Sequence, residues 1–116
     1  MTNPIQAATG QSCLTRFAEP GEGRAARRLI RLGLAKGYTV SVNDGEEWTV
    51  RRSTNQVAII DALCSTGEDV IRFDDEAGRI GIFVLIYGND PDGSELISDH
   101  TDNVACNELY AATYPD

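Results

Sequence analysis

The chain has 116 residues, of which 41% are hydrophobic and 24% charged, and its formal net charge at pH 7 is −8. This composition is that of a soluble globular protein with one domain, and it excludes a disordered chain, which lacks the apolar residues for a core. The longest apolar run, IFVLIY at 82–87, is too short to cross a bilayer, and the N-terminus lacks the apolar region of a signal peptide.

The first predicted element is a helix that follows an irregular N-terminal segment. Residues 1–18 show no clear periodicity, and we expect them to be loosely ordered, with a single domain over 19–116. Apolar residues at helical spacing predict a helix from about Glu22 to Ala35, which Gly37 closes. The opposite face of this helix, which we call the arginine helix, carries Arg24, Arg27, Arg28 and Arg31.

Two strands and a second helix come next in the chain. YTVSV and EWTVR alternate apolar and polar residues, and the NDGE between them predicts a tight hairpin turn. We expect Ser53 or Thr54 to cap a helix over NQVAIIDALCS, which ends at Gly67.

The second half of the chain predicts three strands and a final helix. DVIRF and IGIFVLIYG are strands joined by the turn DDEAGR, and the short strand ELIS follows the turn NDPDGS. IGIFVLIYG is apolar at nearly every position, which predicts that both its faces are covered or that it lies centrally in the sheet. Thr101 is the expected cap of the helix DNVACNELYAATY. The order α-ββ-α-βββ-α predicts an α+β fold, with an antiparallel sheet of about five strands and helices mainly on one face.

Two stretches of the chain are similar to each other. DGEEWTVRRSTNQVA and DGSELISDHTDNVA share an Asp-Gly pair and a later Glu, and then a Thr, a Val and an Ala after a one-residue gap. Both predict a turn, a strand, a cap and a helix. Two explanations stay open: duplication of a ββα unit, or independent selection of the same turn and cap residues.

The second of these stretches holds the single histidine, His100, among acids and hydroxyls. A calcium loop fails at its first and eighth positions, which are Gly88 and Glu95 here. A catalytic triad of Ser98, His100 and a neighbouring aspartate would need side chains of one strand end to converge. A hairpin followed by a helix cap is the simplest interpretation, and a small metal-dependent enzyme centred on His100 stays as an alternative.

The cysteines indicate a reducing environment. Cys13, Cys64 and Cys106 are odd in number, far apart, and without metal-ligand spacing. We expect buried free thiols in a cytoplasmic protein, and we expect neither a cofactor nor a metal ion.

Charge is divided unevenly along the chain. Residues 1–60 hold eight basic and five acidic side chains, whereas residues 61–116 hold two basic and thirteen acidic ones. Three roles for the arginine helix therefore stay open. It can bind the phosphates of a nucleic acid, it can pair with the acidic half of a second copy in a homodimer, or its arginines can simply be solvated. Because the net charge opposes affinity for nucleic acid, direct binding to it is not the favoured interpretation.

The acidic half predicts a negative surface. Its expected members are Asp74, Asp75, Glu76, Asp90, Asp92, Glu95, Asp99 and Asp102. Such a surface is attracted to a basic nucleic-acid-binding groove of a partner protein and can occupy it in place of phosphates. The alternative is that these acids only keep a small protein soluble.

Three stretches within residues 14–103 resemble small acidic proteins of temperate phages and prophages: LTRFAEPGEGRAARRL, DGEEWTVRRS and LIYGNDPDGSELISDHTDN. The resemblance implies an accessory protein of a mobile element, a setting in which compact acidic proteins bind and block host machinery, as anti-CRISPR proteins do. It implies no catalytic residue. We therefore predict a non-enzymatic protein-binding module that inhibits a host protein or nucleoprotein complex of nucleic-acid processing through its acidic half. The alternative is an accessory protein that binds nucleic acid, or itself, through the arginine helix.

Overall fold

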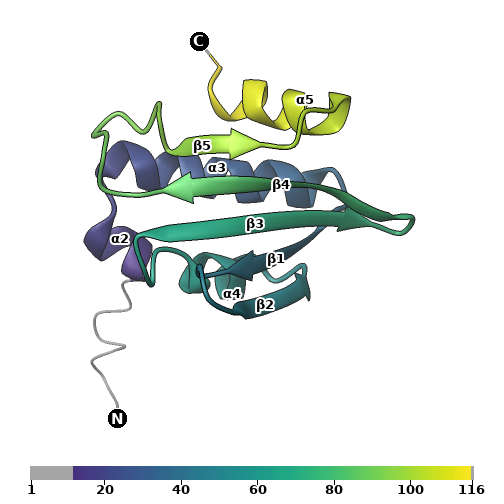
Figure 1. Ribbon diagram of the computed structural model, residues 1–116, viewed down its shortest axis with the longest axis horizontal. Helices are drawn as coiled ribbons and strands as arrows, with labels where there is room; N and C mark the ends of the chain where they lie inside the picture. Colours follow the sequence, from purple (N-terminus) through teal and green to yellow (C-terminus); the bar gives the residue numbers. More distant parts are fainter. Residues whose placement is uncertain (1–11, 116) are drawn as a thin grey trace.

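A five-stranded antiparallel sheet with helices behind one of its faces makes up the fold (Figure 1). The computed structural model describes residues 12–115. The strands lie in the order β2-β1-β3-β4-β5, and they are β1 (Thr39–Asn43), β2 (Trp48–Ser53), β3 (Glu68–Asp75), β4 (Gly78–Ile86) and β5 (Ile97–His100). The helices within the described residues are α2 (Cys13–Phe17), α3 (Pro20–Ala35), α4 (Gln56–Ala62) and α5 (Val104–Thr113). The α+β class and the order of elements expected from the sequence are confirmed, with α2 added at the start.

Helix α2 lies within the segment that was expected to be loosely ordered. The Ser12 side chain accepts a hydrogen bond from the backbone N–H of Thr15 at 3.2 Å and caps this helix. Leu14 is only 1% exposed and belongs to the hydrophobic core, so one apolar side chain anchors the short helix. Residues 1–11 of that segment lie outside the described residues.

Helix α3 packs its small and aliphatic residues against the sheet. Leu29 is fully buried, and Gly33 lies directly against the ring of Phe73, where a Cβ atom would overlap the ring. The helix ends where predicted, because Gly37 adopts a φ of +88° and the Tyr38 N–H donates to the Gly33 carbonyl oxygen at 3.1 Å. Neither α3 nor any other helix in the described part of the chain is long and apolar enough to cross a membrane.

The caps of α4 and α5 differ from those expected. Asn55 caps α4 and Asn103 caps α5, in each case through a side-chain oxygen that accepts from the backbone N–H three residues later. Thr101 instead extends the pairing of β5, because its Oγ1 accepts from the Ile82 N–H at 3.0 Å. The predictions of Ser53 or Thr54 and of Thr101 as caps were therefore wrong. A nearby asparagine takes each role, and its short side chain is well suited to it.

Helix α4 also ends earlier than predicted, at Ala62 instead of close to Gly67. Cys64 has a φ of +63°, outside the helical range, and its N–H donates to the buried Asp69 carboxylate at 2.8 Å. The same carboxylate oxygen accepts from the Tyr87 hydroxyl at 2.7 Å. Burial raises the pKa of Asp69 against these two hydrogen bonds, which lower it. This buried cluster fixes the chain as it leaves α4 and enters β3.

The two similar stretches of sequence form the same local elements. Each gives an edge strand, β2 or β5, followed by a helix with an asparagine cap. The two strands lie at opposite edges of the sheet (Figure 1). Both explanations of the likeness, duplication and independent selection, remain open.

Strand β4 lies between β3 and β5, and its two faces have different surroundings. Phe83 and Leu85 are fully buried on the helix side, whereas Ile82 and Val84 are partly exposed on the other side. Helices α3 and α4 lie behind the sheet in Figure 1, and no helix within residues 12–115 covers its front. Strand β4 is therefore an interior strand with one covered face, whereas the central strand of the sheet is β3. The prediction of two covered faces or a central position was wrong in this detail. We call the uncovered side the open face.

Candidate functional site

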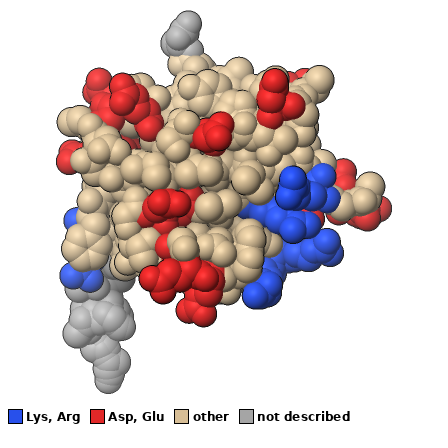
Figure 2. All heavy atoms as spheres, viewed as in Figure 1, with Lys and Arg blue, Asp and Glu red and all other residues tan. Residues whose placement is uncertain are grey.

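A small pocket lies on the open face where β2, β1 and β3 run side by side. Its volume is about 220 Å³, and its lining residues are Ser41, Trp48, Arg51, Arg52, Arg72 and Asp74. Figure 2 shows basic side chains gathered over the same end of the sheet, whereas the acidic side chains lie in separate groups. We call this site the arginine pocket. Its three arginines and one aspartate give it a local formal charge of +2 in a chain of net charge −8.

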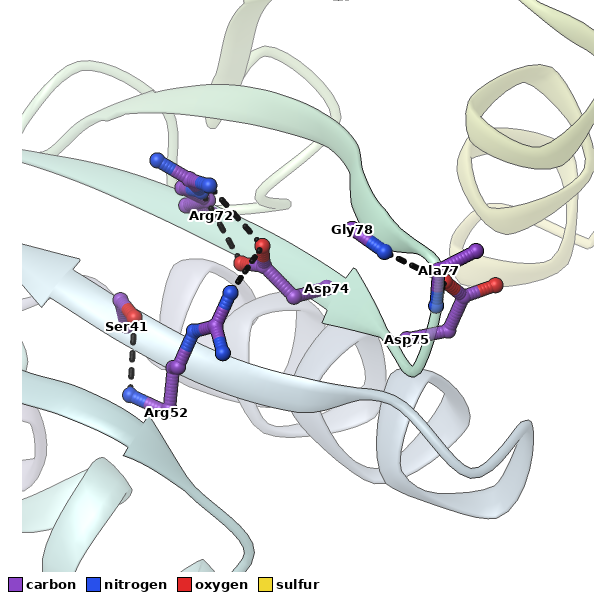
Figure 3. A network of polar contacts seen from close by, with 7 residues as sticks. All are labelled: Ser41, Arg52, Arg72, Asp74, Asp75, Ala77 and Gly78. Atoms are coloured by element: carbon purple, nitrogen blue, oxygen red, sulfur yellow. Dashed lines mark hydrogen bonds and ion pairs between the residues drawn. The ribbon is translucent and has the colours of Figure 1, made fainter.

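A buried carboxylate organises the arginine pocket (Figure 3). The Asp74 side chain is only 2% exposed. It accepts hydrogen bonds from Arg72 Nε and Nη2, both at 2.9 Å, in a two-point pairing that fixes the plane of the guanidinium. Arg52 Nη2 lies 3.5 Å from the same carboxylate. Asp74 therefore holds two arginines from two strands side by side.

A β-bulge brings Arg52 to the pocket. The pairing of β1 with β2 shifts register between Val40 and Val42, so that Arg51 and Arg52 both lie opposite Ser41. Arg52 has a φ of +48°, in the left-handed region that an arginine adopts only at a cost of about 1 kcal/mol. Its backbone N–H donates to the Ser41 Oγ at 2.9 Å, which holds the bulge in place. Bulges of this kind re-aim side chains beside functional sites.

Arg51 and Trp48 are the two lining residues without a described polar partner. Arg51 is exposed, and no carboxylate among residues 12–115 forms an ion pair with it. Trp48 is partly exposed, and within the same residues its indole N–H makes no hydrogen bond and its ring has no aromatic neighbour. Both side chains are therefore available to a ligand.

The acids expected on one negative surface are divided among different places. Asp74 is buried in the arginine pocket, so it adds no exposed negative charge. Asp75 stabilises the β3–β4 turn, where it accepts from the N–H groups of Ala77 and Gly78, and Glu76 is exposed beside it. This turn lies at the opposite end of the sheet from the loop between β4 and β5 (Figure 1).

The remaining expected acids follow one edge of the sheet. The Asp90 side chain stabilises the β4–β5 loop, where it accepts hydrogen bonds from Ser94 Oγ at 2.6 Å and from the backbone N–H groups of Asp92 and Glu95. The Ser94 hydrogen bond is the main cause that holds the pKa of Asp90 below its usual range. The other members of this group are exposed, and they are Asp92, Glu95, Asp99 and Asp102. We call these four residues the acidic edge.

The arginines of α3 do not form one stripe. Arg27 donates to the Thr15 hydroxyl of α2. Arg24 and Arg28 border a shallow depression on the other side of the helix, together with Asp92 and the C-terminal Tyr114. Arg31 is exposed. The four arginines therefore do not form the single basic face that was expected, because Arg27 contacts α2 and Arg24 and Arg28 lie beside a different depression.

His100 lies on the helix side of the sheet and is part of an aromatic stack. Its ring is 5.3 Å from the ring of Phe83 and 4.9 Å from that of Tyr110, nearly parallel to both. Its Nδ1 lies 2.9 Å from the Thr101 carbonyl oxygen, which can only accept, so Nδ1 carries a proton. No group of three or more potential metal ligands occurs in residues 12–115.

The three cysteines are free thiols, as the sequence predicted. Cys64 and Cys106 are buried and Cys13 is partly buried. Burial, with a contribution from the Asp69 charge, raises the pKa of the Cys64 thiol from 9.0 to about 11. Cys64 is therefore a weak nucleophile at neutral pH.

Sequence reasoning missed the arginine pocket. Its signal was an arginine between two apolar residues, Arg72 between Ile71 and Phe73 of β3, together with the Arg51-Arg52 pair near the end of β2. Comparisons of the chain with protein-family models, with curated proteins and with solved structures found no match. The geometry of the pocket therefore carries the functional argument.

Proposed function

We propose that the chain is a non-enzymatic binding protein that holds an anionic group in the arginine pocket. The observation that carries this proposal is the buried Asp74, which fixes Arg72 and Arg52 beside each other. Arg72 gives two of its five N–H groups to Asp74, so the others remain for a ligand. Positioned guanidinium groups of this kind bind phosphate or carboxylate through paired hydrogen bonds.

Two further features support an anion as the ligand. The Ser41 hydroxyl accepts from Arg52 and donates to no described group, so its own hydrogen is available. Arg51 adds a third positive charge without a described carboxylate partner. Because this charge is concentrated in one place, it attracts an anion at short range even though the chain as a whole is negative.

Titration of inorganic phosphate by calorimetry or by NMR tests the proposal. We expect a dissociation constant on the order of 1 mM for the wild-type chain. Arg51→Ala is expected to weaken binding about tenfold, since a charge-assisted hydrogen bond contributes about 1.5 kcal/mol. The fold should survive, because Arg51 is exposed and its side chain makes no ion pair with a described residue.

Arg31→Ala is the matched control, because Arg31 is exposed on α3, on the far side of the sheet from the pocket. It should leave phosphate binding unchanged. Absence of binding to the wild-type chain, or equal loss in both variants, would contradict the proposal.

A second candidate function is inhibition of a host nucleic-acid-processing complex by a protein of a mobile element. It is favoured by the acidic edge, whose four carboxylates are exposed along β5, the preceding loop and the start of α5. Such an edge complements a basic groove of a partner protein. The two candidates use different surfaces of one binding protein, so separate variants test them.

Charge reversal of the acidic edge tests this second candidate. The triple variant Asp92→Lys, Glu95→Lys, Asp99→Lys is expected to abolish a salt-sensitive, nuclease-resistant interaction with a basic bacterial protein while the melting temperature is kept. Asp90 is left unchanged, because its side chain holds the loop. Glu46→Lys, in the exposed turn before β2, serves as the control. Equal capture of the partner by wild type and triple variant would remove this candidate.

A further inference from the structure

We propose that the ligand of the arginine pocket is a small phosphorylated molecule with a planar ring, of the nucleoside monophosphate class, whose ring stacks on Trp48. This inference rests on the proposed anion binding and names the ligand class. Trp48 lines the same pocket as the three arginines. One site therefore offers an indole surface beside guanidinium groups, which is the combination that recognises a base together with its phosphate.

Trp48 is less constrained than the other aromatic side chains near the sheet. The Tyr87 ring also has no aromatic neighbour among the described residues, but it is buried and its hydroxyl donates to Asp69 at 2.7 Å. Phe73 contacts Tyr38 and Phe83, and Tyr110 contacts His100 and Tyr114, so these rings stabilise one another. Trp48 has no such neighbour among the described residues, and it lies on an edge strand, opposite Asn43 of β1. Its side chain is partly exposed and is not among the core residues or those packed against them, so part of its ring is available for stacking.

The register of the sheet places the two halves of the site side by side. Ser41 of β1 is paired with Arg72 of β3, and Asn43, two residues later on the same side of β1, is paired with Trp48 of β2. Side chains two residues apart on a strand point to the same face. The pairing of β1 with β2 shifts register again between Val42 and Asn43, and Trp48 lines the same pocket as the arginines at this irregular end of β2. The phosphate side and the ring side of the pocket therefore lie on one face.

The size and charge of the site favour a small ligand over a nucleic-acid strand. Its volume of about 220 Å³ is below the 300–1,000 Å³ usual for sites that enclose a whole ligand, so it takes a phosphate and one face of a ring. A strand would place many phosphates against a chain of net charge −8, whereas one phosphate meets only the local charge of +2.

Tryptophan fluorescence is a direct probe of the site, because Trp48 is the single tryptophan of the chain. Adenosine monophosphate is expected to quench this fluorescence and to bind roughly tenfold more tightly than ribose 5-phosphate, which has no ring to stack. In Trp48→Leu, followed by calorimetry, the two ligands should bind equally, at the affinity of ribose 5-phosphate for the wild-type chain. Trp48→Phe should keep part of the preference.

The results separate this inference from the proposed function. If phosphate, ribose 5-phosphate and adenosine monophosphate bind the wild-type chain equally and without quenching, anion binding stands and the ring site is refuted. If none of the three binds, both proposals fail. If a short oligothymidylate binds more tightly than adenosine monophosphate, the assignment to a small ligand is overturned in favour of a single strand.

Discussion

Replacement of Glu22 by alanine is expected to lower the free energy of unfolding by about 3–5 kcal/mol. The Glu22 side chain is completely buried in the first turn of α3. Its two oxygens accept hydrogen bonds of 2.9–3.2 Å from four backbone N–H groups, those of Glu19, Gly88, Asn89 and Asp90. Alanine would leave these donors buried without an acceptor, and it would release the β4–β5 loop from α3.

The same carboxylate makes the stability depend on pH. Burial acts to raise the pKa of Glu22, but the backbone N–H donors together outweigh it and lower this pKa below its usual value of 4.5. A carboxylate whose pKa is lower in the folded chain contributes its full stabilisation above about pH 4.5 and loses it as the pH falls through the folded pKa. Acid should therefore weaken the junction between α3 and the loop.

Urea unfolding at pH 7 and at several values between pH 5 and 3 tests both statements. Glu22→Gln keeps one acceptor oxygen but loses the charge, so we expect a smaller loss of stability at pH 7, of about 2 kcal/mol, and a flatter pH profile than that of the wild type. Glu95→Gln, an exposed residue of the same loop, is the control and should change neither quantity. Identical pH profiles for wild type and Glu22→Gln would show that another group causes the dependence.

Local signals in the sequence were sufficient for the elements of the fold but not for their long-range contacts. Helical periodicity and Gly37 predicted the body and the end of α3, because both are properties of adjacent residues. The role of Glu22 depends on Gly88 and its neighbours, which are distant in sequence and meet α3 only after the sheet has formed. The caps failed for a different reason, since Thr101 and Asn103 are both good caps and only the pairing with Ile82 decides between them.

The candidate site depends even more on long-range contacts that the sequence did not predict. Arg52 and Arg72 meet because β1 lies between β2 and β3, an order that the sequence did not specify. Asp74 and Asp75 are adjacent in the chain and were expected to act together on one surface. In the fold, one is buried against the arginines and the other stabilises a turn, because successive strand residues point to opposite sides and a register shift follows Phe73. Grouping by charge along the sequence therefore combined residues with different roles.

The two partners of the Asp74–Arg72 ion pair are expected to respond unequally to substitution. Arg72→Ala should lower the free energy of unfolding by about 2–4 kcal/mol, because it leaves the carboxylate buried with only Arg52, at 3.5 Å, as a partner. Asp74→Asn should cost only about 1 kcal/mol, since the side chains of Arg72 and Arg52 are 35% and 65% exposed and water can solvate them. Lys36→Ala provides the control, because its pair with Glu108 is exposed on both sides and contributes less than about 1 kcal/mol.

Phosphate binding should change in the opposite direction to stability in Asp74→Asn. Asparagine keeps one side-chain oxygen that can accept from Arg72, so we expect the two guanidinium groups to stay side by side. Loss of the negative charge raises the local formal charge of the arginine pocket from +2 to +3, so the affinity for phosphate should rise about threefold to tenfold. Arg72→Ala should abolish measurable binding under conditions where the variant remains folded. If Asp74→Asn weakened phosphate binding instead, the carboxylate would be needed mainly to position the arginines. Geometry, and not net charge, would then limit the affinity of the pocket.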